Sequence, residues 1–556
     1  MIDYKNCLDY VCRFTKTKVG DGKSLIELTA YEGTTLWFFV DFRFHNFVCR
    51  TLNSDINKKS TRNRILVLLY GYIKIYLNTS LLLLTKCLLK HYKQLEIKRD
   101  DENKTPKILF TAQDVEWRVI RDYETYNTKK SDAFFDSIIT RLVGTNGFNL
   151  VGIFPLNPSV ISLRVFIDKL KNWYIPHKPL NLYWSLDLWK KENEAAKYLK
   201  GTWSTLKTGD VFKNLCTYNG ADLYSQMENE IDFYFYVLFP HAVTYIEMAK
   251  RMIEIEKPDL ILIQNEYGYF ERALVIAGKL KGIPTLAVQH GIITPMHHGY
   301  MFNKDIRGTI ILPDITCVYG RYYYDLLTKN SIYDPEQVVV TGQPRYDILY
   351  DVANVYSKNR FLKTYGIDVK SKIVLWTTQS HGISDEENRK YLKLIFEVMQ
   401  NIRHITLIIK QHPGEGEKYT RMIRDYMGQY DVDSVITQKN SDTYEQLYVC
   451  DLMITKNSTT AIEAVALNKP VIVLNLSGEP DIVNYVEEGI ALGVYRENDL
   501  KTAIETLLKD DSELAKNRSV YVEKYLYRID GKATERVANE INKLLRKNKH
   551  MQIDEN

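Results

Sequence analysis

The chain has 556 residues, which is more than one hydrophobic core normally supports, so two large domains with additional segments are expected. Its net charge of +5, from 74 basic and 69 acidic residues, is small for this length and argues against a dedicated nucleic-acid-binding protein. The seven cysteines include no C-x-x-C pair, which argues against a zinc site and a disulfide framework and is typical of a reduced, cytoplasmic protein.

Residues 1–107 are interpreted as an N-terminal extension. Residues 1–10 are polar and include two aspartates, so no signal peptide is expected there. Residues 36–48 are rich in aromatic side chains that alternate imperfectly with polar ones, and this pattern predicts a strand.

Residues 65–89 form an apolar stretch long enough to cross a bilayer at about 1.5 Å per residue, but Lys74, Asn78 and Lys86 interrupt it. Because charges inside a membrane span are costly, a buried core helix is favoured over a span. Basic residues on both sides keep a third alternative open, a helix lying on the membrane surface.

Residues 108–355 are expected to form a first α/β domain. Strands are expected at 108–111, 149–154, 260–264, 285–289, 315–319 and 338–341, with a weaker candidate at 180–186. Helical spacing covers 134–142, 227–256 and 270–281.

Residues 356–510 are expected to form a second α/β domain, followed by C-terminal helices over 511–556. Its strands are expected at 373–377, 405–410, 435–437, 452–455 and 471–474. Apolar strands that alternate with helices are typical of a parallel sheet covered on both faces. The fold class predicted is therefore α/β with two doubly wound, Rossmann-like domains, and a ligand would lie in the cleft where strand ends face each other.

The stretch from 444 to 474 follows the pattern helix, strand, polar turn, helix, strand. The polar turn consists of Lys456, Asn457, Ser458, Thr459 and Thr460. Hydroxyl groups at a helix start cap free backbone N–H groups, and the same N–H groups can bind an anion. Glu463 lies close enough to this turn to accept both hydroxyls of a ribose. Taken alone, the hydroxyl cluster indicates an ordinary capped crossover.

Other polar side chains follow predicted strands of the second domain. Gln379 and Ser380 come after its first strand, and His412 comes after its second. A single histidine in a turn is more often exposed and structural. With an apolar strand before it and the 456–460 turn downstream, His412 is favoured as a donor that stabilises a leaving phosphate.

In the first domain, Glu266 and His290 each follow a predicted strand. Glu266 is a candidate general base for an acceptor hydroxyl, and capping of the helix that starts near Gly268 is an equally good alternative. His290 competes for the same role or binds acceptor or donor. Asp114 and Glu116 are weaker candidates.

Three segments carry a resemblance to a known family. They are the 444–474 stretch with Asp451, Thr455, Ser458, Glu463 and N-K-P-V-I, the run LIIKQHPGEG at 407–416, and the run VTGQPRYD at 340–347. Together they resemble GT-B glycosyltransferases. The likeness is to capsule and surface-polysaccharide transferases, CDP-glycerol polyol-phosphate transferases and UDP-N-acetylglucosamine 2-epimerases, and it covers roughly the second half of the chain.

The resemblance implies a GT-B fold and a nucleotide-activated sugar as co-substrate, with no cofactor and no metal. It also implies that Gly342 and Arg345 belong to an interdomain hinge lining the donor cleft, where Arg345 meets a phosphate. Gln379, Ser380, Lys456, Ser458, Thr459, Thr460 and Glu463 complete the expected donor site. No aspartate-x-aspartate triplet is interpreted as the metal-holding motif of GT-A glycosyltransferases, in agreement with leaving-group stabilisation by the protein.

The expected function is a glycosyltransferase that builds a capsule, surface-glycan or lipid-linked product at the cytoplasmic face of the membrane, with peripheral contact through 65–89. Alternatives within the enzymes are a UDP-N-acetylglucosamine 2-epimerase-like protein and a polyol-phosphate transferase. About 200 residues beyond one ordinary two-domain unit argue against the epimerase. A non-catalytic scaffold for polysaccharide assembly is the alternative from another class.

Overall fold

The computed structural model describes residues 4–53, 105–122, 125, 127–145, 147–156, 163–172, 175–379, 384–412, 414–439 and 441–554. The apolar stretch 65–89 and Ser380 therefore lie outside the described residues. Of the helices in the described part, none combines the length and the apolar character needed to cross a membrane.

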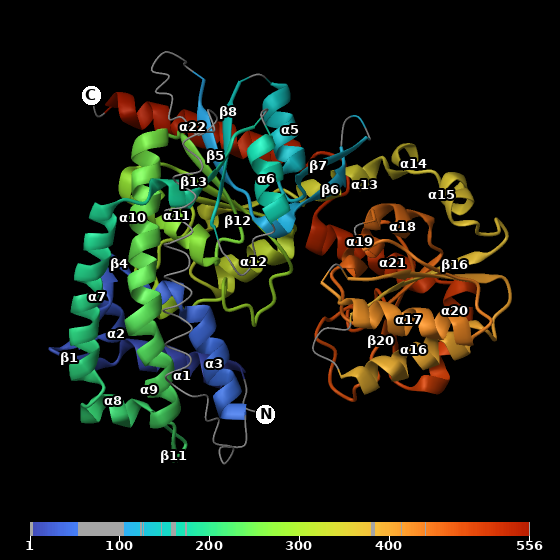
Figure 1. Ribbon diagram of the computed structural model, residues 1–556, viewed down its shortest axis with the longest axis horizontal. Helices are drawn as coiled ribbons and strands as arrows, with labels where there is room; N and C mark the ends of the chain where they lie inside the picture. Colours follow the sequence, from blue (N-terminus) through green and yellow to red (C-terminus); the bar gives the residue numbers. More distant parts are fainter. Residues whose placement is uncertain are drawn as a thin grey trace.

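The first half of the molecule is built on a seven-stranded parallel sheet in the order β15–β14–β13–β12–β5–β8–β9 (Figure 1). In chain order its strands are β5 (Lys107–Thr111), β8 (Asn149–Phe154), β9 (His177–Pro179), β12 (Leu260–Gln264), β13 (Thr285–Val288), β14 (Ile315–Val318) and β15 (Val338–Val340). β5 pairs in parallel with both β8 and β12, so the chain crosses over between neighbouring strands through helices.

Alternate residues of the strands pack on opposite faces of this sheet. In β12, Leu260 and Leu262 belong to a core with α5 (Asp136–Gly144) and the C-terminal α22 (Ala533–Asp554). Ile261 and Ile263 belong to the core that includes α10 (Phe239–Glu256) and α11 (Tyr269–Lys281). The chain thus returns at its end to cover the first sheet.

The second half is a six-stranded parallel sheet in the order β18–β17–β16–β19–β20–β21. In chain order its strands are β16 (Lys372–Thr377), β17 (Ile405–Lys410), β18 (Ser434–Ile436), β19 (Leu452–Thr455), β20 (Val471–Leu474) and β21 (Leu492–Val494). α16 (Asp385–Met399), α17 (Glu417–Gln429) and α20 (Leu500–Lys509) share a core with one face. α18 (Thr443–Val449) and α19 (Thr460–Ala466) share a core with the other. The predicted pair of doubly wound parallel sheets is confirmed, with β21 as an additional strand.

Two strand predictions are wrong. Residues 36–48 form a short 3₁₀ turn, η1 (Leu36–Phe39), followed by α3 (Asp41–Asn53), because their aromatic rings pack as a cluster around Trp37 instead of lining one sheet face. Residues 180–186 form a second turn, η4 (Leu180–Tyr183), before α7 (Leu186–Leu206), and β9 lies just upstream of it. In apolar runs this short, the periodicity of the sequence does not distinguish a strand from a helical turn.

The described N-terminal helices and those between residues 186 and 256 pack beside the first sheet. α1 (Tyr4–Lys16) contacts α3, and α7 contacts α10. α9 (Tyr224–Phe233) runs into α10 through a π-helical turn, η5 (Tyr234–Leu238). A helical assembly therefore lies beside the first sheet (Figure 1).

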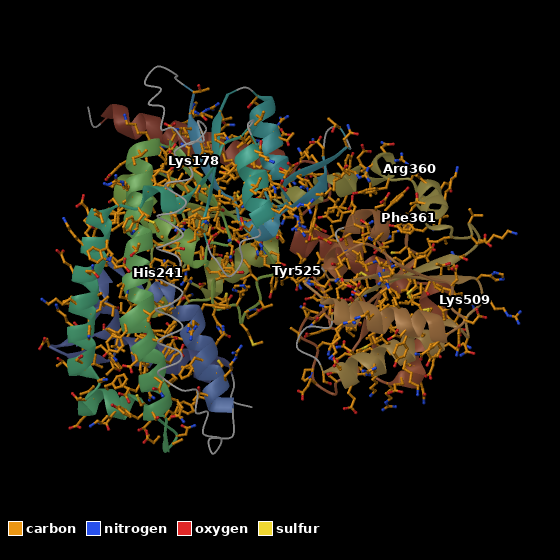
Figure 2. The ribbon with its side chains drawn as sticks, in the orientation of Figure 1. Lys178, His241, Arg360, Phe361, Lys509 and Tyr525 are labelled. Carbon is orange, nitrogen blue, oxygen red and sulfur yellow. The ribbon has the colours of Figure 1, made fainter. Side chains whose placement is uncertain are left out.

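The two halves meet through the C-terminal segment and a hairpin. Tyr525 lies between them (Figure 2), and its ring contacts Tyr322 and Tyr323 of α12 (Arg321–Asn330) at centroid distances of 4.5 and 6.1 Å. A Cβ atom on Gly320 would lie 2.4 Å from the Tyr525 backbone, so this approach requires glycine. The sequence did not indicate the hairpin of β6 (Trp117–Arg121) and β7 (Thr128–Asp132), which reaches the second half.

Candidate functional site

The candidate site lies where strands of both sheets end and the two halves approach each other. From the first half, His290 follows β13, and Arg345 lies just after β15 in η8 (Pro344–Tyr346). From the second half, His412 follows β17, and the 456–460 turn follows β19. This is the position at which doubly wound folds bind ligands.

Arg345 is the centre of this arrangement. Its Nη2 lies 3.8 Å from Oε1 of Glu463 in the second half, and its charge also acts on Glu116 in the first half. Tyr444 donates a hydrogen bond of 3.4 Å to the same Glu463 oxygen. One guanidinium group of the first half therefore pairs with a carboxylate of the second half and acts electrostatically on a carboxylate of its own half.

The two carboxylates differ in their electrostatics. Burial acts to raise the pKa of Glu116, but contact with His290 and the charges of Arg118 and Arg345 outweigh it and lower that pKa to about 2. Burial raises the pKa of Glu463 and is only partly opposed by Arg345, Arg118 and Tyr444. Glu116 is thus firmly ionised at neutral pH, and Glu463 is the carboxylate whose charge depends on its surroundings.

His290 and Glu116 form a pair within the first half. Oε1 of Glu116 lies 3.6 Å from Nε2 of His290, whose side chain is 33% exposed. The other carboxylate oxygen accepts a hydrogen bond of 3.1 Å from Arg118. An ionised carboxylate beside one ring nitrogen favours the proton on that nitrogen and leaves the lone pair on the other.

Glu266 lies in a buried environment with other partners. Its carboxylate is buried and accepts hydrogen bonds from Tyr333 at 2.5 Å and from Thr316 at 3.1 Å, and burial raises its pKa to about 7. It does not cap α11, whose N-cap is Gly268 without a side-chain hydrogen bond. Glu266 and His290, predicted as competitors for one role, thus lie in different environments.

His412 is exposed, and its Nδ1 accepts a hydrogen bond of 3.1 Å from the Gly414 N–H. The neutral ring therefore carries its proton on Nε2, where it can donate. Lys410, at the end of the same strand, donates to the backbone of Gln411 and Lys439 at 3.1 and 2.6 Å. Burial and the charge of Arg118 lower the pKa of Lys410 to about 8.

The 456–460 turn is held by a hydrogen bond within it and by hydrogen bonds with neighbouring residues. Oε1 of Gln379 accepts from the Asn457 N–H at 2.6 Å, and Oγ of Ser458 accepts from the Thr460 N–H at 3.2 Å. Lys456 lies 3.1 Å from Glu387 and 5.4 Å from the centre of the Tyr391 ring. Gln379 thus supports the turn, and Thr459 is its exposed hydroxyl.

Gly342 contributes to the site through the backbone. Its φ of +79° is favourable for glycine, and a Cβ atom there would lie 3.2 Å from Ala533 and Arg536 of α22. Gln343, the next residue, donates to the Tyr319 hydroxyl at 2.6 Å and accepts from the Arg345 N–H at 3.4 Å. The turn therefore places Arg345 beside Glu463 and packs against the C-terminal helix.

Three residues that act on this site were not identified from the sequence, namely Arg118, Lys410 and Tyr444. Lys410 stands directly before the Q-H-P run, and Tyr444 opens the 444–474 stretch, so both lie inside segments that the sequence singled out. Arg118 lies on the unexpected hairpin. Within the described residues, the one group of three metal-ligand side chains whose ligand atoms converge consists of His45, Cys49 and His298 in another part of the first half.

Comparison with known proteins agrees with this architecture. Residues 277–543 match the family model of CDP-glycerol:poly(glycerophosphate) glycerophosphotransferases, and this range contains His290, Arg345, His412 and Glu463. Among curated proteins none matches the chain.

Several solved structures are similar. UDP-GlcNAc 2-epimerase from Neisseria meningitidis, bound to UDP-GlcNAc, is 15% identical, with 79% of this chain and 100% of that chain covered and a TM-score of 0.50. UDP-GlcNAc 2-epimerase from Methanocaldococcus jannaschii is 14% identical, with 78% of this chain and 99% of that chain covered and a TM-score of 0.48. A glycosyltransferase from Rickettsia africae is 14% identical, with 81% of this chain and 98% of that chain covered and a TM-score of 0.41. The first of these likenesses shows the fold, and the GT-B prediction is confirmed.

Proposed function

We propose that this chain, a transferase of GT-B fold, moves a sugar from a nucleotide-activated donor to a surface-glycan, capsule or lipid-linked acceptor. The observation that carries the proposal is the pairing of Arg345 with Glu463 across the two halves, together with the charge that Arg345 exerts on Glu116. A guanidinium group placed where the two halves meet is suited to receive a phosphate that enters there.

The donor would occupy the side formed by the second half. Glu463 accepts the ribose hydroxyls once it is released from Arg345, and Arg345 with Lys410 and Arg118 offsets the phosphate charge. Ser458, Thr459 and Thr460 are proposed to contact the phosphate, with Gln379 and Lys456 supporting their turn. His412 donates its Nε2 proton toward the leaving phosphate oxygen.

The acceptor would enter from the side formed by the first half. His290 takes the proton from the acceptor hydroxyl with the ring nitrogen opposite Glu116, and Glu116 stabilises the imidazolium that results. A bond forms between the acceptor oxygen and the anomeric carbon, and the bond from that carbon to the phosphate oxygen breaks. The nucleoside diphosphate then leaves. The protein itself supplies each charge that this step needs.

Polyol-phosphate transfer is a second candidate, which the family match over 277–543 favours. In that reaction the acceptor oxygen attacks phosphorus and a nucleoside monophosphate leaves. The same cations serve both reactions because phosphate charge develops at the same side of the cleft.

A panel of UDP-, GDP-, CMP- and CDP-activated sugars together with CDP-polyols tests both candidates. Released nucleoside diphosphate, or nucleoside monophosphate from a CMP-sugar, supports sugar transfer, and CMP from a CDP-polyol supports polyol-phosphate transfer. An isomerised sugar without nucleotide release would indicate an epimerase, and no turnover of any donor would indicate a scaffold.

Contact with the inner face of the cell membrane through residues 65–89 remains a prediction. Extraction of a membrane fraction with high salt or carbonate checks it. Release by either treatment is expected, whereas retention until detergent is added would indicate a span.

A further inference from the structure

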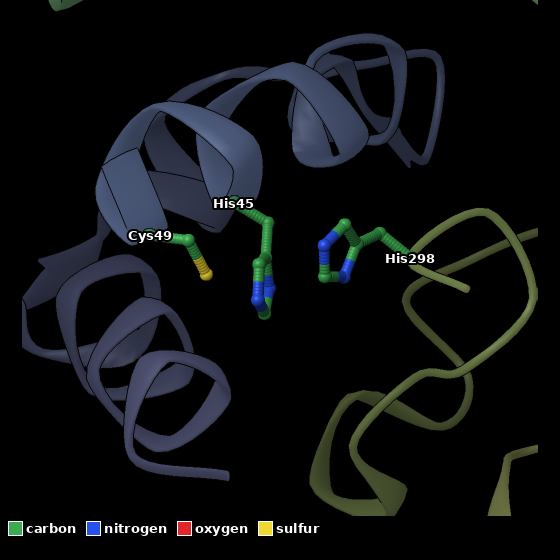
Figure 3. A group of neighbouring side chains, drawn as sticks. All are labelled: His45, Cys49 and His298. Atoms are coloured by element: carbon green, nitrogen blue, oxygen red, sulfur yellow. The ribbon is translucent and has the colours of Figure 1, made fainter. Parts of the chain in front are cut away.

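His45, Cys49 and His298 bring three metal-ligand side chains together in the N-terminal part of the first half. His45 and Cys49 are four residues apart on α3, so they share one face of that helix. His298 comes from the loop after β13, and the ligand atoms of all three lie within 4.8 Å of one another. Figure 3 shows the two histidine rings and the cysteine sulfur arranged side by side between helix and loop.

One member of this cluster is buried, and the other two are half-buried. His45 is 3% exposed, and its ring stacks on that of His298 with centroids 3.5 Å apart. A histidine ring with one proton keeps a lone pair on its other nitrogen, and this lone pair is what a metal ion requires.

The neighbouring acidic group has a different partner. Asp41, one turn before His45 on α3, pairs with the buried Arg272 at 2.5 Å. The cluster consequently offers two imidazole nitrogens and one sulfur and no carboxylate. This donor set suits a borderline-soft transition metal and does not suit magnesium or calcium.

We propose that His45, Cys49 and His298 form a binding site for a zinc ion. Three protein ligands are a common zinc set, and the fourth position would be taken by water or by Cys7, whose thiol contacts Cys49. On binding, the Cys49 thiol loses its proton to solvent and forms the Zn–S bond. With Zn–N of about 2.0–2.1 Å and Zn–S of about 2.3 Å, the ligand atoms must approach by roughly 1 Å, which side-chain rotation can supply.

The position of the site gives the ion a structural role. His298 lies eight residues after His290 on one loop, and α3 lies outside the family match. A metal joining them would fasten the loop that begins at His290 to the N-terminal helices. This inference does not depend on the proposed donor chemistry, because the site is apart from the residues assigned to the donor.

Metal content and cobalt titration of the full-length reduced protein test the proposal. One zinc per chain is expected after purification without chelator. After zinc is removed, Co²⁺ should bind with a tetrahedral visible spectrum and a thiolate-to-cobalt charge-transfer band. These measurements use the unaltered chain, so they do not depend on whether a variant folds.

The variants Cys49→Ser and His298→Ala should weaken Co²⁺ binding by about 100-fold or more. Removing only a residue that hydrogen-bonds to a metal ligand already lowers metal affinity by about 10–100-fold, and removing the ligand itself should cost at least as much. Cys49→Ser should also reduce the charge-transfer band, completely if water fills the fourth position and in part if Cys7 does. Cys12→Ser on α1 is the matched control and should bind like the unaltered chain. Loss of the charge-transfer band in Cys7→Ser but not in Cys49→Ser, or absence of the band from the unaltered chain, would overturn the assignment.

Discussion

Nη2 of Arg345 and Oε1 of Glu463 lie 3.8 Å apart across the two halves of the molecule, although 118 positions separate them in the chain. Each residue is assigned to the donor, Arg345 to phosphate and Glu463 to ribose. Their mutual contact therefore occupies the place that the donor would take. Donor binding is expected to replace this pair with one contact from each half, which couples nucleotide recognition to the arrangement of the two domains.

The first prediction separates the ribose and phosphate contacts. Glu463→Gln should weaken binding of nucleoside and full donor alike by about 1–3 kcal/mol, because it degrades a hydrogen bond to a charged group. Ser458→Ala should weaken phosphate-bearing ligands and leave nucleoside binding nearly unchanged. Calorimetric titration with nucleoside, nucleotide and nucleotide-sugar measures both patterns. Glu505→Gln on α20 is the control, and equal losses for every ligand in the two cleft variants would make the turn purely structural.

The second prediction concerns the leaving group. His412→Ala should lower turnover by about 100-fold, since removal of one preorganised donor to transition-state charge costs about 3 kcal/mol. His404→Asn is a matched control because His404 precedes the same strand, β17, at its opposite end. Initial rates of both variants and of the unaltered chain, measured at saturating donor, give the turnover numbers to compare. Equal turnover in the two variants would remove His412 from the mechanism.

The third prediction concerns pH and the buried Glu266. Burial raises its pKa from 4.5 to about 7, so the folded chain holds a proton there that the unfolded chain releases at lower pH. The stability contributed by this group is complete below about pH 4.5 and is lost as pH rises to about 7. Glu266→Gln should therefore gain stability relative to the unaltered chain between pH 5 and pH 7.5, as measured by denaturant unfolding at both values. An unchanged difference between the two proteins at both pH values would show that Glu266 does not titrate in this range.

The fourth prediction concerns chelation. Because phosphate charge is assigned to Arg345, Lys410 and His412, donor binding and turnover should survive EDTA at temperatures well below unfolding. The thermal unfolding temperature should fall if zinc leaves His45, Cys49 and His298. Turnover and thermal unfolding are measured on the same chelated sample. Loss of turnover from a chelated sample that is still folded, restored by Mg²⁺ or Mn²⁺, would contradict the protein-based mechanism but not the zinc site.

The sequence alone determined the strands that are buried on both faces. Leu260–Gln264, Ile405–Lys410 and Val471–Leu474 were predicted with the bounds that the structure has. A strand covered by helices on both sides must be apolar at nearly every position. This pattern can be recognised in the sequence without knowing which elements pack against the strand. The polar residues after such strands were identified for the same reason, since site positions in these folds follow strand ends.

The tertiary structure decided which of those residues meet. Arg118 joins the cleft through a hairpin whose strands are largely polar and partly exposed, so no apolar periodicity marked it. Glu266 and His290 each follow a predicted strand, so the sequence made them equivalent candidates. Only the packing shows that Glu266 is buried and that His290 lies beside Glu116. The His45, Cys49 and His298 cluster has no compact sequence motif because its third ligand lies about 250 positions from the first two. Such contacts arise from chain topology, which brings together residues that are far apart in the sequence. The residues next to each of them in the sequence show no pattern that would predict the contact.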